Sequence, residues 1–181
     1  MEYTPYYCEE NVLRLAEHRD RPDDWVLMIS NRARRVALAR QHAGRGPGGI
    51  VVWDYHVILA NRPVEQAGST LVIDRDSSLG QPVPLCRYLA LTFPRTLFRM
   101  GFSDEPSFTL VAAADYRARF SSDRSHMLDV DGHYVHQPPP WPATYDEATG
   151  NTLFALCDGV DSGVTAVLSL EALRAWDRCE P

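Results

Sequence analysis

The chain has 181 residues, of which 45% are apolar and 10% aromatic, so it is long enough to bury a core of its own. Its formal net charge of −6 and its pI of about 5.5 argue against nucleic acid as a main partner. We therefore expect a single domain that spans residues 1–181 and acts as a monomer.

We expect no export signal at the start of the chain. Met1–Pro5 contains neither the basic region nor the apolar region of a signal peptide, and no apolar run approaches the length of a membrane span. We expect no membrane contact and a cytoplasmic location, which would extend to the nucleus if the source is eukaryotic.

The four cysteines lie far apart and include no Cys-x-x-Cys pair. In a cytosolic chain of this size we expect them to be thiols and not a disulfide framework. Neither the cysteines nor the six histidines have the spacing of a zinc site, so we expect no metal. The cysteines are Cys8, Cys86, Cys157 and Cys179.

The first predicted helix begins at or just after Cys8. Apolar residues recur at helical spacing within Val12–Ala16, and the acidic pair Glu9–Glu10 falls in the first turn, where it suits the positive end of the helix dipole. A helix N-terminus lowers the pKa of a thiol and offers free N–H groups to an oxyanion. The alternative is that Cys8 is a small buried residue that packs the start of the helix.

Two apolar runs predict strands in the first third of the chain. One is Trp25–Ile29, and the other is Val51–Leu59, which is rich in β-branched residues and follows a glycine-rich loop. Between them, Arg34–Arg40 fits either a strand or a helix. His56 lies inside the second run, where an imidazole must satisfy two ring nitrogens. It is either a hydrogen-bonded core residue or a catalyst.

A further strand is predicted over Thr70–Ile73, after a short turn at Gln66-Ala67-Gly68. We expect it to form a hairpin with the strand of His56, which would bring Asp74 close to the imidazole. Asp76 lies two residues further on and can share a face with Asp74 by strand alternation. The spacing leaves both aspartates open as the partner of the histidine.

The rest of the chain contains shorter elements. The polar segment Ser121–Met127 is interpreted as a solvated turn with local side-chain caps, and His133–Thr144, which is rich in proline, as a stiff segment that wraps around the protein. The other predicted elements are helices over Leu85–Phe93 and Pro94–Met100, a strand over Phe108–Ala112, a helix or turn over Asp115–Phe120, a strand over Val164–Leu168, and a helix over Leu170–Trp176 that Ser169 caps.

A thiol at a helix start, a histidine on a strand and an aspartate on the next strand follow one another in the order of papain-type and transglutaminase-type sites. In such a site the histidine takes the thiol proton, and the aspartate accepts from the other ring nitrogen and so fixes the orientation of the ring. Because the spacing is loose, this order alone is weak evidence.

The amino-acid sequences of several segments are more specific evidence than this order of residues. These segments are Tyr7–Asn11, Ile29–Asn31, Val52–Val57, Ile73–Asp76, Phe120–Met127 and Pro138–Pro142. In this order they resemble the protein N-terminal glutamine amidohydrolase family, over nearly the whole chain. The pair Trp-Asp-Tyr-His and Ser-Asp-Arg-Ser-His-Met is far more specific than a cysteine and a histidine at loose spacing.

The resemblance implies an α/β (α+β) fold of the papain-like and transglutaminase-like kind, with a helix-borne cysteine packed on a mainly antiparallel sheet. It implies hydrolysis of the side-chain amide of an N-terminal glutamine to glutamate and ammonia, without a cofactor or a metal, within N-terminal degradation (the N-degron pathway). By motif, Cys8 is the nucleophile, His56 the base and Asp74 the orienting acid, since Asp74 matches the first aspartate of the family's Asp-x-Asp.

Selectivity for a chain terminus requires a group that recognises the α-ammonium, because a desolvated ammonium needs acceptors. Within the Ser-Asp-Arg-Ser-His-Met segment, Asp123 is the candidate, unless Arg124 pairs with it and makes the segment structural. Trp53 and Tyr55 are candidates for the walls of the substrate pocket, although strand alternation would place both on the face opposite His56.

Two alternatives remain open. One is another papain-like cysteine hydrolase, such as a peptidase, or a transglutaminase relative. The other is a catalytically silent module that binds N-terminal glutamine or glutamate, which a thiol no more reactive than free cysteine would favour.

Overall fold

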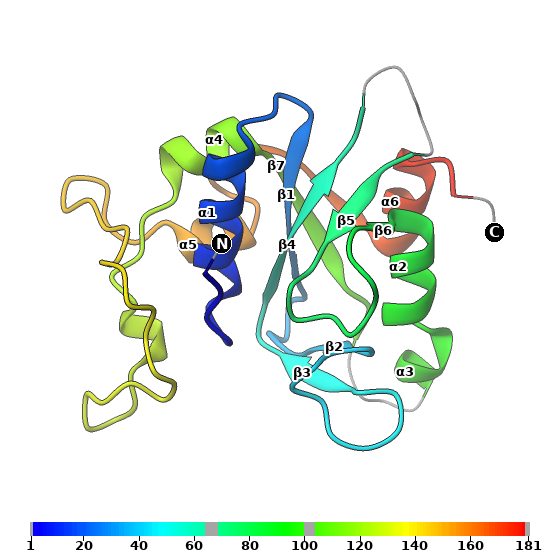
Figure 1. The fold of residues 1–181 in the computed structure, drawn as a ribbon, viewed down its shortest axis with the longest axis horizontal. Coiled ribbons are helices and arrows are strands. Elements are labelled where there is room, and N and C mark those ends of the chain that lie inside the picture. The colour runs from blue at the N-terminus through cyan, green and yellow to red at the C-terminus, as the bar shows by residue number, and fades with distance from the viewer. Residues whose placement is uncertain (1, 64–68, 100–103, 180–181) are drawn as a thin grey trace.

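The computed structural model describes residues 2–63, 69–99 and 104–179. A six-stranded sheet in the order β6-β5-β4-β1-β7-β8 forms the middle layer (Figure 1). All of its described pairings are antiparallel, so the predicted mixed fold with a mainly antiparallel sheet is confirmed. The strands are β1 (Asp24–Ser30), β2 (Val36–Leu38), β3 (Val51–Trp53), β4 (His56–Asn61), β5 (Leu71–Ile73), β6 (Val83–Pro84), β7 (Ser107–Ala112) and β8 (Val164–Ser169).

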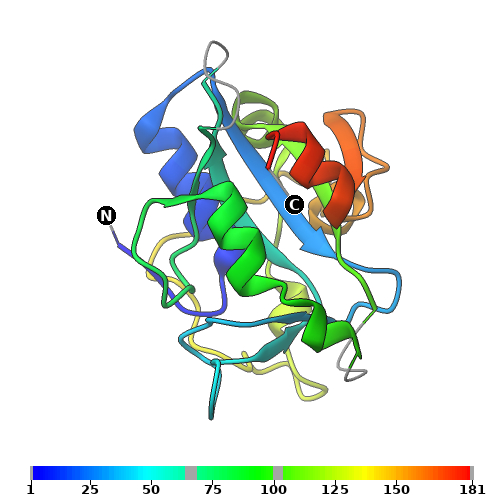
Figure 2. The same ribbon diagram turned by 90° about the vertical axis from the view of Figure 1, so that its right-hand side faces the viewer.

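Helices cover both faces of this sheet. In Figure 1, α1, α4 and α5 lie on one side, and α2 and α6 lie on the other, where Figure 2 shows them in front of the strands. Among the described residues, no helix is both long enough and apolar enough to cross a membrane. The helices are α1 (Cys8–Arg19), α2 (Leu85–Thr92), α3 (Arg95–Arg99), α4 (Ala113–Arg119), the 3-10 turn η1 (Ser125–Met127), α5 (Leu153–Cys157) and α6 (Leu170–Trp176).

The central strand β1 supplies both layers of the core. Val26 and Met28 pack with the helices α1 and α4, whereas Leu27 and Ile29 pack with the residues of α2 and α6. All four side chains are fully buried. A strand that is covered on both faces has a continuous apolar sequence and not an alternating one, which is why the Trp25–Ile29 run predicts it correctly.

The run predicted as one strand over Val51–Leu59 is two strands in the structure. β3 pairs with β2 in a separate two-stranded sheet, and β4 belongs to the main sheet. Asp54 marks the break, because its carbonyl accepts from Ser30 Oγ at 2.6 Å and its Oδ1 from the N–H of Tyr55 at 2.9 Å. A side chain that bonds the backbone of its own turn competes with the strand ladder. The alternation expected around His56 is therefore lost.

The predicted hairpin between the strands of His56 and Asp74 is confirmed. β4 pairs with β5, with Leu59 opposite Ile73. The turn predicted at Gln66-Ala67-Gly68 lies outside the described residues. The segment that fitted either a strand or a helix contains β2.

Most elements predicted for the second half are also confirmed, with shifts of one or two residues at their ends. Ser169 caps α6 as expected, since its Oγ accepts from the N–H of Ala172 at 3.1 Å. Met100, the predicted end of one helix, lies outside the described residues. The helix α5 was not predicted, because five residues are too few to show a helical period.

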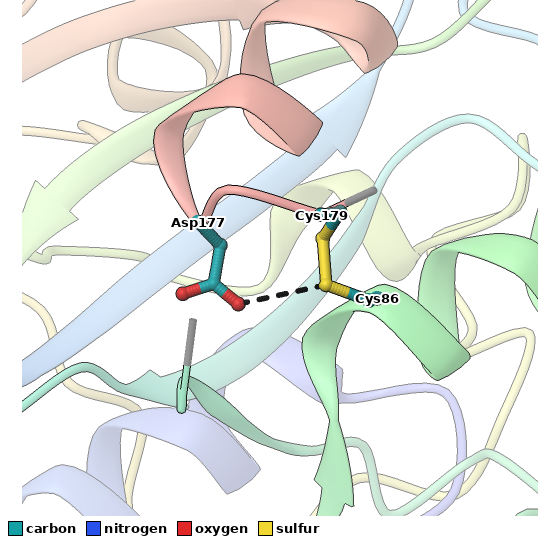
Figure 3. Close-up of side chains that lie close together, drawn as sticks. All are labelled: Cys86, Asp177 and Cys179. Atoms are coloured by element: carbon teal, nitrogen blue, oxygen red, sulfur yellow. Dashed lines mark hydrogen bonds between the residues drawn. A yellow bond between two sulfur atoms is a disulfide. The ribbon is translucent and has the colours of Figure 1, made fainter. Parts of the chain in front are cut away.

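The expectation of four thiols is wrong. Cys86 of α2 and Cys179, which follows α6, form a disulfide bond with their Cα atoms 5.4 Å apart (Figure 3). Asp177 lies beside it, with a carboxylate oxygen 3.8 Å from the Cys86 sulfur. The packing of α2 against α6 brings the cysteines together from 93 residues apart, which no local spacing could indicate. Cys8 and Cys157 are free and buried.

Candidate active site

The hairpin brings His56 and Asp74 together. His56 is the first residue of β4, Asp74 follows β5, and the imidazole Nε2 lies 2.9 Å from Asp74 Oδ1. Each side chain is only 1% exposed. By spacing alone, either Asp74 or Asp76 could be the hydrogen-bond partner of His56. In the structure, Asp74 is the residue that lies at hydrogen-bonding distance from the ring nitrogen Nε2.

Donors from several elements surround the Asp74 carboxylate. Tyr88 Oη of α2 donates to Oδ2 at 2.8 Å, Gln41 Nε2 donates to the same oxygen at 3.3 Å, and the N–H of Asp76 donates to Oδ1 at 3.1 Å. Burial acts to raise the pKa of Asp74, but His56, Tyr88 and Gln41 together lower it. The aspartate is thus held as a carboxylate.

The charge of Asp74 acts in turn on His56. Burial disfavours the imidazolium, yet the adjacent carboxylate and its hydrogen bond outweigh this, so the pKa of His56 is raised. Because Nε2 faces Asp74, Nδ1 is the ring nitrogen that remains for proton transfer. The arrangement suits a base that accepts a proton at Nδ1 while Asp74 stabilises the resulting cation.

Cys8 faces the same cavity as His56 from the start of α1. As the first helical residue, it has an N–H without an intrahelical acceptor. The N–H of Val57, the residue after His56, hydrogen-bonds to the thiol and lowers its pKa. The structure therefore brings together all three residues that the sequence proposed as catalytic.

The resting thiol is not activated in the way that its helix position predicts. Burial raises the pKa of Cys8 well above its ordinary value, and the carboxylates of Glu9 and Asp76 raise it further. Glu9 is fully buried, its Oε2 lies 3.5 Å from the Cys8 sulfur, and its Oε1 accepts no hydrogen bond from any residue that the structure describes. Burial and these two carboxylates therefore outweigh the hydrogen bond from the N–H of Val57, which acts to lower the pKa of Cys8.

The cavity has a volume of about 200 Å³, below the roughly 300–1,000 Å³ of sites for drug-sized ligands, and is of a size for a single residue. Trp53 stacks on His56 with 5.8 Å between ring centroids, and its Nε1 donates to Gln41 Oε1 at 3.3 Å. The lining residues are Tyr6, Cys8, Trp53, Asp54, Tyr55, His56, Asp76, His126, Met127, Val135 and His136.

Comparison with known proteins identifies the family to which the chain belongs. A family model described as N-terminal glutamine amidase matches residues 3–173. The chain belongs to the N-terminal glutamine amidase family. Relatives named protein N-terminal glutamine amidohydrolase from Drosophila erecta, Drosophila sechellia and Drosophila mojavensis are each 35% identical over 175 residues, covering 93% of this chain and 84% of theirs. The resemblance inferred from the sequence motifs is confirmed.

The N-terminal segment and a distant loop form the walls of the cavity in this member of the N-terminal glutamine amidase family. The Tyr6 ring stacks on His136 with centroids 3.6 Å apart, and Tyr7 Oη donates to the His136 carbonyl at 3.0 Å. Tyr55 Oη lies 3.0 Å from His126 Nε2, which is itself 3.6 Å from Glu9 Oε1. Trp53 and Tyr55 both line the cavity, as the sequence proposed for its walls.

The family segment Ser-Asp-Arg-Ser-His-Met is only in part the solvated turn with local side-chain caps that its composition predicts, because Asp123 is exposed and accepts from the N–H of Ser125 while Arg124 is buried. Arg124 is buried and pairs with both oxygens of Glu10 at 2.6 and 2.7 Å. It also donates to the carbonyl of Trp141 at 2.9 Å, and Trp141 Nε1 donates back to Glu10 at 2.7 Å. This Arg124–Glu10–Trp141 clamp fixes the proline-rich segment against α1.

Asp123, the sequence candidate for recognition of an ammonium, does not reach the cavity. It is exposed, and its Oδ1 accepts from the N–H of Ser125 at 2.8 Å and from Asn151 Nδ2 at 3.0 Å. Arg124 does not pair with it. The motif therefore contributes His126 and Met127 to the cavity, and Asp123 to a surface turn.

Sequence reasoning missed the residues that contact Asp74 and Cys8. Gln41 and Tyr88 come from segments without any motif, and Glu9 was assigned only to the helix dipole. Hydrogen bonds between side chains far apart in the chain leave no periodic signal, and only the packed fold reveals them.

Proposed function

We propose that this protein hydrolyses the side-chain amide of an N-terminal glutamine in peptides and proteins, which yields N-terminal glutamate and ammonia. Cys8 is the nucleophile, His56 the acid–base and Asp74 the orienting carboxylate. Membership of the N-terminal glutamine amidase family supports the substrate. The geometric support is that Nε2 of His56 is hydrogen-bonded to Asp74, so that Nδ1 is the ring nitrogen left for proton transfer. His56 and Cys8 line the same cavity.

In the first half of the reaction, His56 Nδ1 takes the thiol proton as the Cys8 sulfur attacks the δ-carbon of the amide. The negative charge that develops on the amide oxygen is stabilised by the N–H of Cys8 at the helix start. The C–N bond then breaks, and His56 returns the proton to the departing nitrogen, which leaves as ammonia. The product of this half is a thioester between Cys8 and the glutamyl side chain.

In the second half, a water molecule replaces ammonia in the cavity. His56 takes a proton from it, the hydroxide attacks the thioester carbon, and the C–S bond breaks. The sulfur leaves as a thiolate, and His56 returns its proton to it. Every proton that moves in this cycle passes through Nδ1, so the hydrogen bond from Nε2 to Asp74 persists throughout.

The shape of the cavity favours one terminal residue over an extended peptide. Trp53 and Tyr55 form two walls, and the Tyr6–His136 stack forms another. An internal glutamine would have to bring chain on both sides into a space of about 200 Å³. This is the argument against a peptidase or a transglutaminase, each of which needs an open cleft.

The wider proposal is that residues 1–181 act as one domain and as a monomer in the cytoplasm, within N-terminal degradation. The fold is of the papain-like and transglutaminase-like kind, in which a helix carries the cysteine and strands of the packed sheet carry the histidine and aspartate. The position of Cys8 at the start of α1 and of His56 and Asp74 on the β4–β5 hairpin supports this likeness.

The deciding experiment is ammonia release from four peptides: one beginning with glutamine, its N-acetylated form, one beginning with asparagine, and one with glutamine inside the chain. We expect release from the first alone, and none in Cys8→Ala or Cys8→Ser at unchanged thermal stability. Release from internal glutamine would indicate a general deamidase or a transglutaminase relative. No release by the folded wild type, together with binding of the first peptide, would indicate a silent binding module.

A further inference from the structure

The cavity at Cys8 carries negative charge with little to balance it. Among the described residues that line it, the carboxylates are Asp54 and Asp76, and the only basic side chains are histidines. Glu9 adds a buried carboxylate next to the thiol. A ligand that brings a positive charge into this cavity would supply the missing balance.

Asp76 is placed to meet such a cation. It is 7% exposed and lines the cavity, and one of its carboxylate oxygens lies within 4.8 Å of a ring nitrogen of His56. The hydroxyl of Tyr3 donates to Oδ1. Among the described residues, none donates to Oδ2 and none forms an ion pair with Asp76. One oxygen is thus held in place while the other is left to accept from a ligand.

In the substrate-free protein, the cost of burying the negative charge of Asp76 is only partly offset by its neighbours. Burial raises its pKa, and the attraction of His56 and the hydrogen bond from Tyr3 offset this only in part. A hydrogen bond between two charged groups is stronger than one between neutral groups, and it is stronger still where water is excluded. An ammonium ligand would therefore gain more here than at an exposed carboxylate.

We propose that Asp76 binds the α-ammonium of the terminal glutamine, with Tyr3 holding the carboxylate in position. The inference rests on the proposed function. In glutamine four bonds separate the α-nitrogen from the δ-carbon, a reach of about 5 Å. An amide carbon at the Cys8 sulfur therefore keeps the ammonium near a carboxylate that lies beside both Cys8 and His56.

Binding of the α-ammonium by Asp76 would account for selectivity against three other substrates: an acetylated terminus, an internal glutamine and an N-terminal asparagine. An acetylated terminus has no charge and would leave Asp76 buried and unpaired, which is costly. An internal glutamine fails for the same reason. Asparagine is one methylene shorter, so an ammonium held at Asp76 would leave its amide carbon short of the Cys8 sulfur.

The other carboxylates are less suited to this role. Asp54 is exposed, so water screens its charge, and its Oδ1 is engaged with the N–H of Tyr55. Asp123 is exposed and lies outside the cavity. Glu9 is fully buried and is not part of the lining, so it acts on Cys8 without reaching the substrate.

The bound ammonium also affects the nucleophile. Asp76 is one of the carboxylates that raise the pKa of Cys8, and pairing it with a cation cancels that contribution. The thiolate then forms more readily when the correct substrate is present. Selectivity for a free amine should therefore appear in kcat as well as in KM.

The test compares a peptide that begins with glutamine with its desamino analogue, the same peptide carrying a 4-carbamoylbutanoyl group. We expect wild type to favour the amine by at least about 100-fold in kcat/KM, in line with the strength of buried charged hydrogen bonds. In Asp76→Asn this preference should fall below about tenfold through a larger loss on the amine substrate, because the effects of Asp76 on Cys8 and His56 are common to both peptides. Asp123→Ala, which removes an exposed carboxylate outside the cavity, is the matched control and should keep the preference within about threefold of wild type.

An equal loss on both peptides in Asp76→Asn would overturn the proposal, since Asp76 would then act through His56. An unchanged preference would overturn it as well. If Asp76→Asn fails to fold, Tyr3→Phe takes its place, and an unchanged preference in that folded variant would count against the role of Tyr3 and Asp76.

A binding measurement separates this proposal from the proposed function. Calorimetry in a Cys8→Ala background compares the two peptides with and without Asp76→Asn, and it needs no turnover. Tighter binding of the amine that depends on Asp76 would support the ammonium site even if wild type released no ammonia. Catalysis by wild type with equal binding of both peptides would reject the ammonium site and leave the proposed function standing.

Discussion

His56 Nε2 lies 2.9 Å from Asp74 Oδ1, across a hairpin whose two side chains are each 1% exposed. Such a pair is stable only because further donors reach the carboxylate, since Tyr88 and Gln41 both donate to Asp74 Oδ2. Trp53 extends this hydrogen-bond network by donating to Gln41, and its ring stacks on His56. The orientation of the imidazole is therefore set by residues from four separate segments of the chain.

Replacing Asp74 by asparagine keeps the size of the side chain and removes its charge. The pKa of His56 should fall, because burial would then act on the imidazolium without a carboxylate to oppose it. We expect kcat for ammonia release to drop by roughly 10²–10⁴-fold, as when the acid of other catalytic triads is neutralised. Tyr88→Phe, which removes one donor and keeps the charge, is the control and should cost about tenfold or less. Near wild-type activity in Asp74→Asn would contradict the role given to this pair.

Glu9 lies beside the resting thiol and acts to raise its pKa. After burial, it is the largest contributor to the raised pKa of Cys8, so Glu9→Gln should lower that pKa and increase the thiolate fraction at a given pH. We expect alkylation by iodoacetamide to speed up by at least about threefold at pH 8, since one pKa unit corresponds to tenfold. The curve of rate against pH should move to lower pH without a change in shape.

The matched background for this measurement is Cys157→Ala. Cys157 is the other free cysteine among the described residues, and burial raises its pKa to about 11. Its removal leaves Cys8 as the thiol that is followed, and Glu17→Gln on the exposed side of α1 serves as a charge control. An unchanged or slower alkylation in Glu9→Gln would show that the carboxylate does not oppose the thiolate.

What the sequence predicted well was carried by strong local signals. The continuous apolar run Trp25–Ile29, the hairpin to Asp74 and the capped helix after Ser169 all follow from apolar patterns and end signals within a few residues. The Cys8, His56 and Asp74 set came from the order of motifs, and the fold places the three together. Here local propensity and the final packing agree.

What the sequence could not predict depends on contacts between distant segments. The strand through His56 breaks at Asp54 because Ser30, from another strand, binds its carbonyl. Asp123 has the right chemistry for an ammonium but faces a surface turn, whereas Asp76 faces the cavity. Only the three-dimensional register distinguishes two carboxylates of equal charge.

The Arg124–Glu10–Trp141 clamp should be important for stability. The Arg124 and Glu10 side chains are 6% and 1% exposed, and removal of one partner from a buried ion pair leaves the other charge uncompensated. We expect Arg124→Met to lower the free energy of unfolding by about 3–5 kcal/mol, measured by urea denaturation. Arg117→Met breaks the exposed pair with Asp20 and should cost less than about 1 kcal/mol.

A double variant tests whether the charge is the cause. Adding Glu10→Gln to Arg124→Met removes the uncompensated carboxylate, so part of the lost stability should return. Additive losses would instead indicate that the packing of the two side chains, and not their charges, holds the proline-rich segment against α1.

The disulfide between Cys86 and Cys179 should stabilise the fold without taking part in catalysis. It ties the end of α6 to α2 across 93 residues of sequence, and a cross-link over so long a loop restricts the unfolded chain strongly. Reduction should lower the free energy of unfolding by about 2–4 kcal/mol. Because the bond joins α2 to α6 (Figure 3), on the face of the sheet opposite α1 (Figure 1), the helix that begins at Cys8, kcat should stay within about twofold of its oxidised value. The control is the Cys86→Ser, Cys179→Ser double variant, whose urea midpoint should match that of the reduced protein and should not respond to dithiothreitol. A loss of activity in this variant at a temperature where it is folded would show that α2 transmits the constraint through Tyr88 to Asp74.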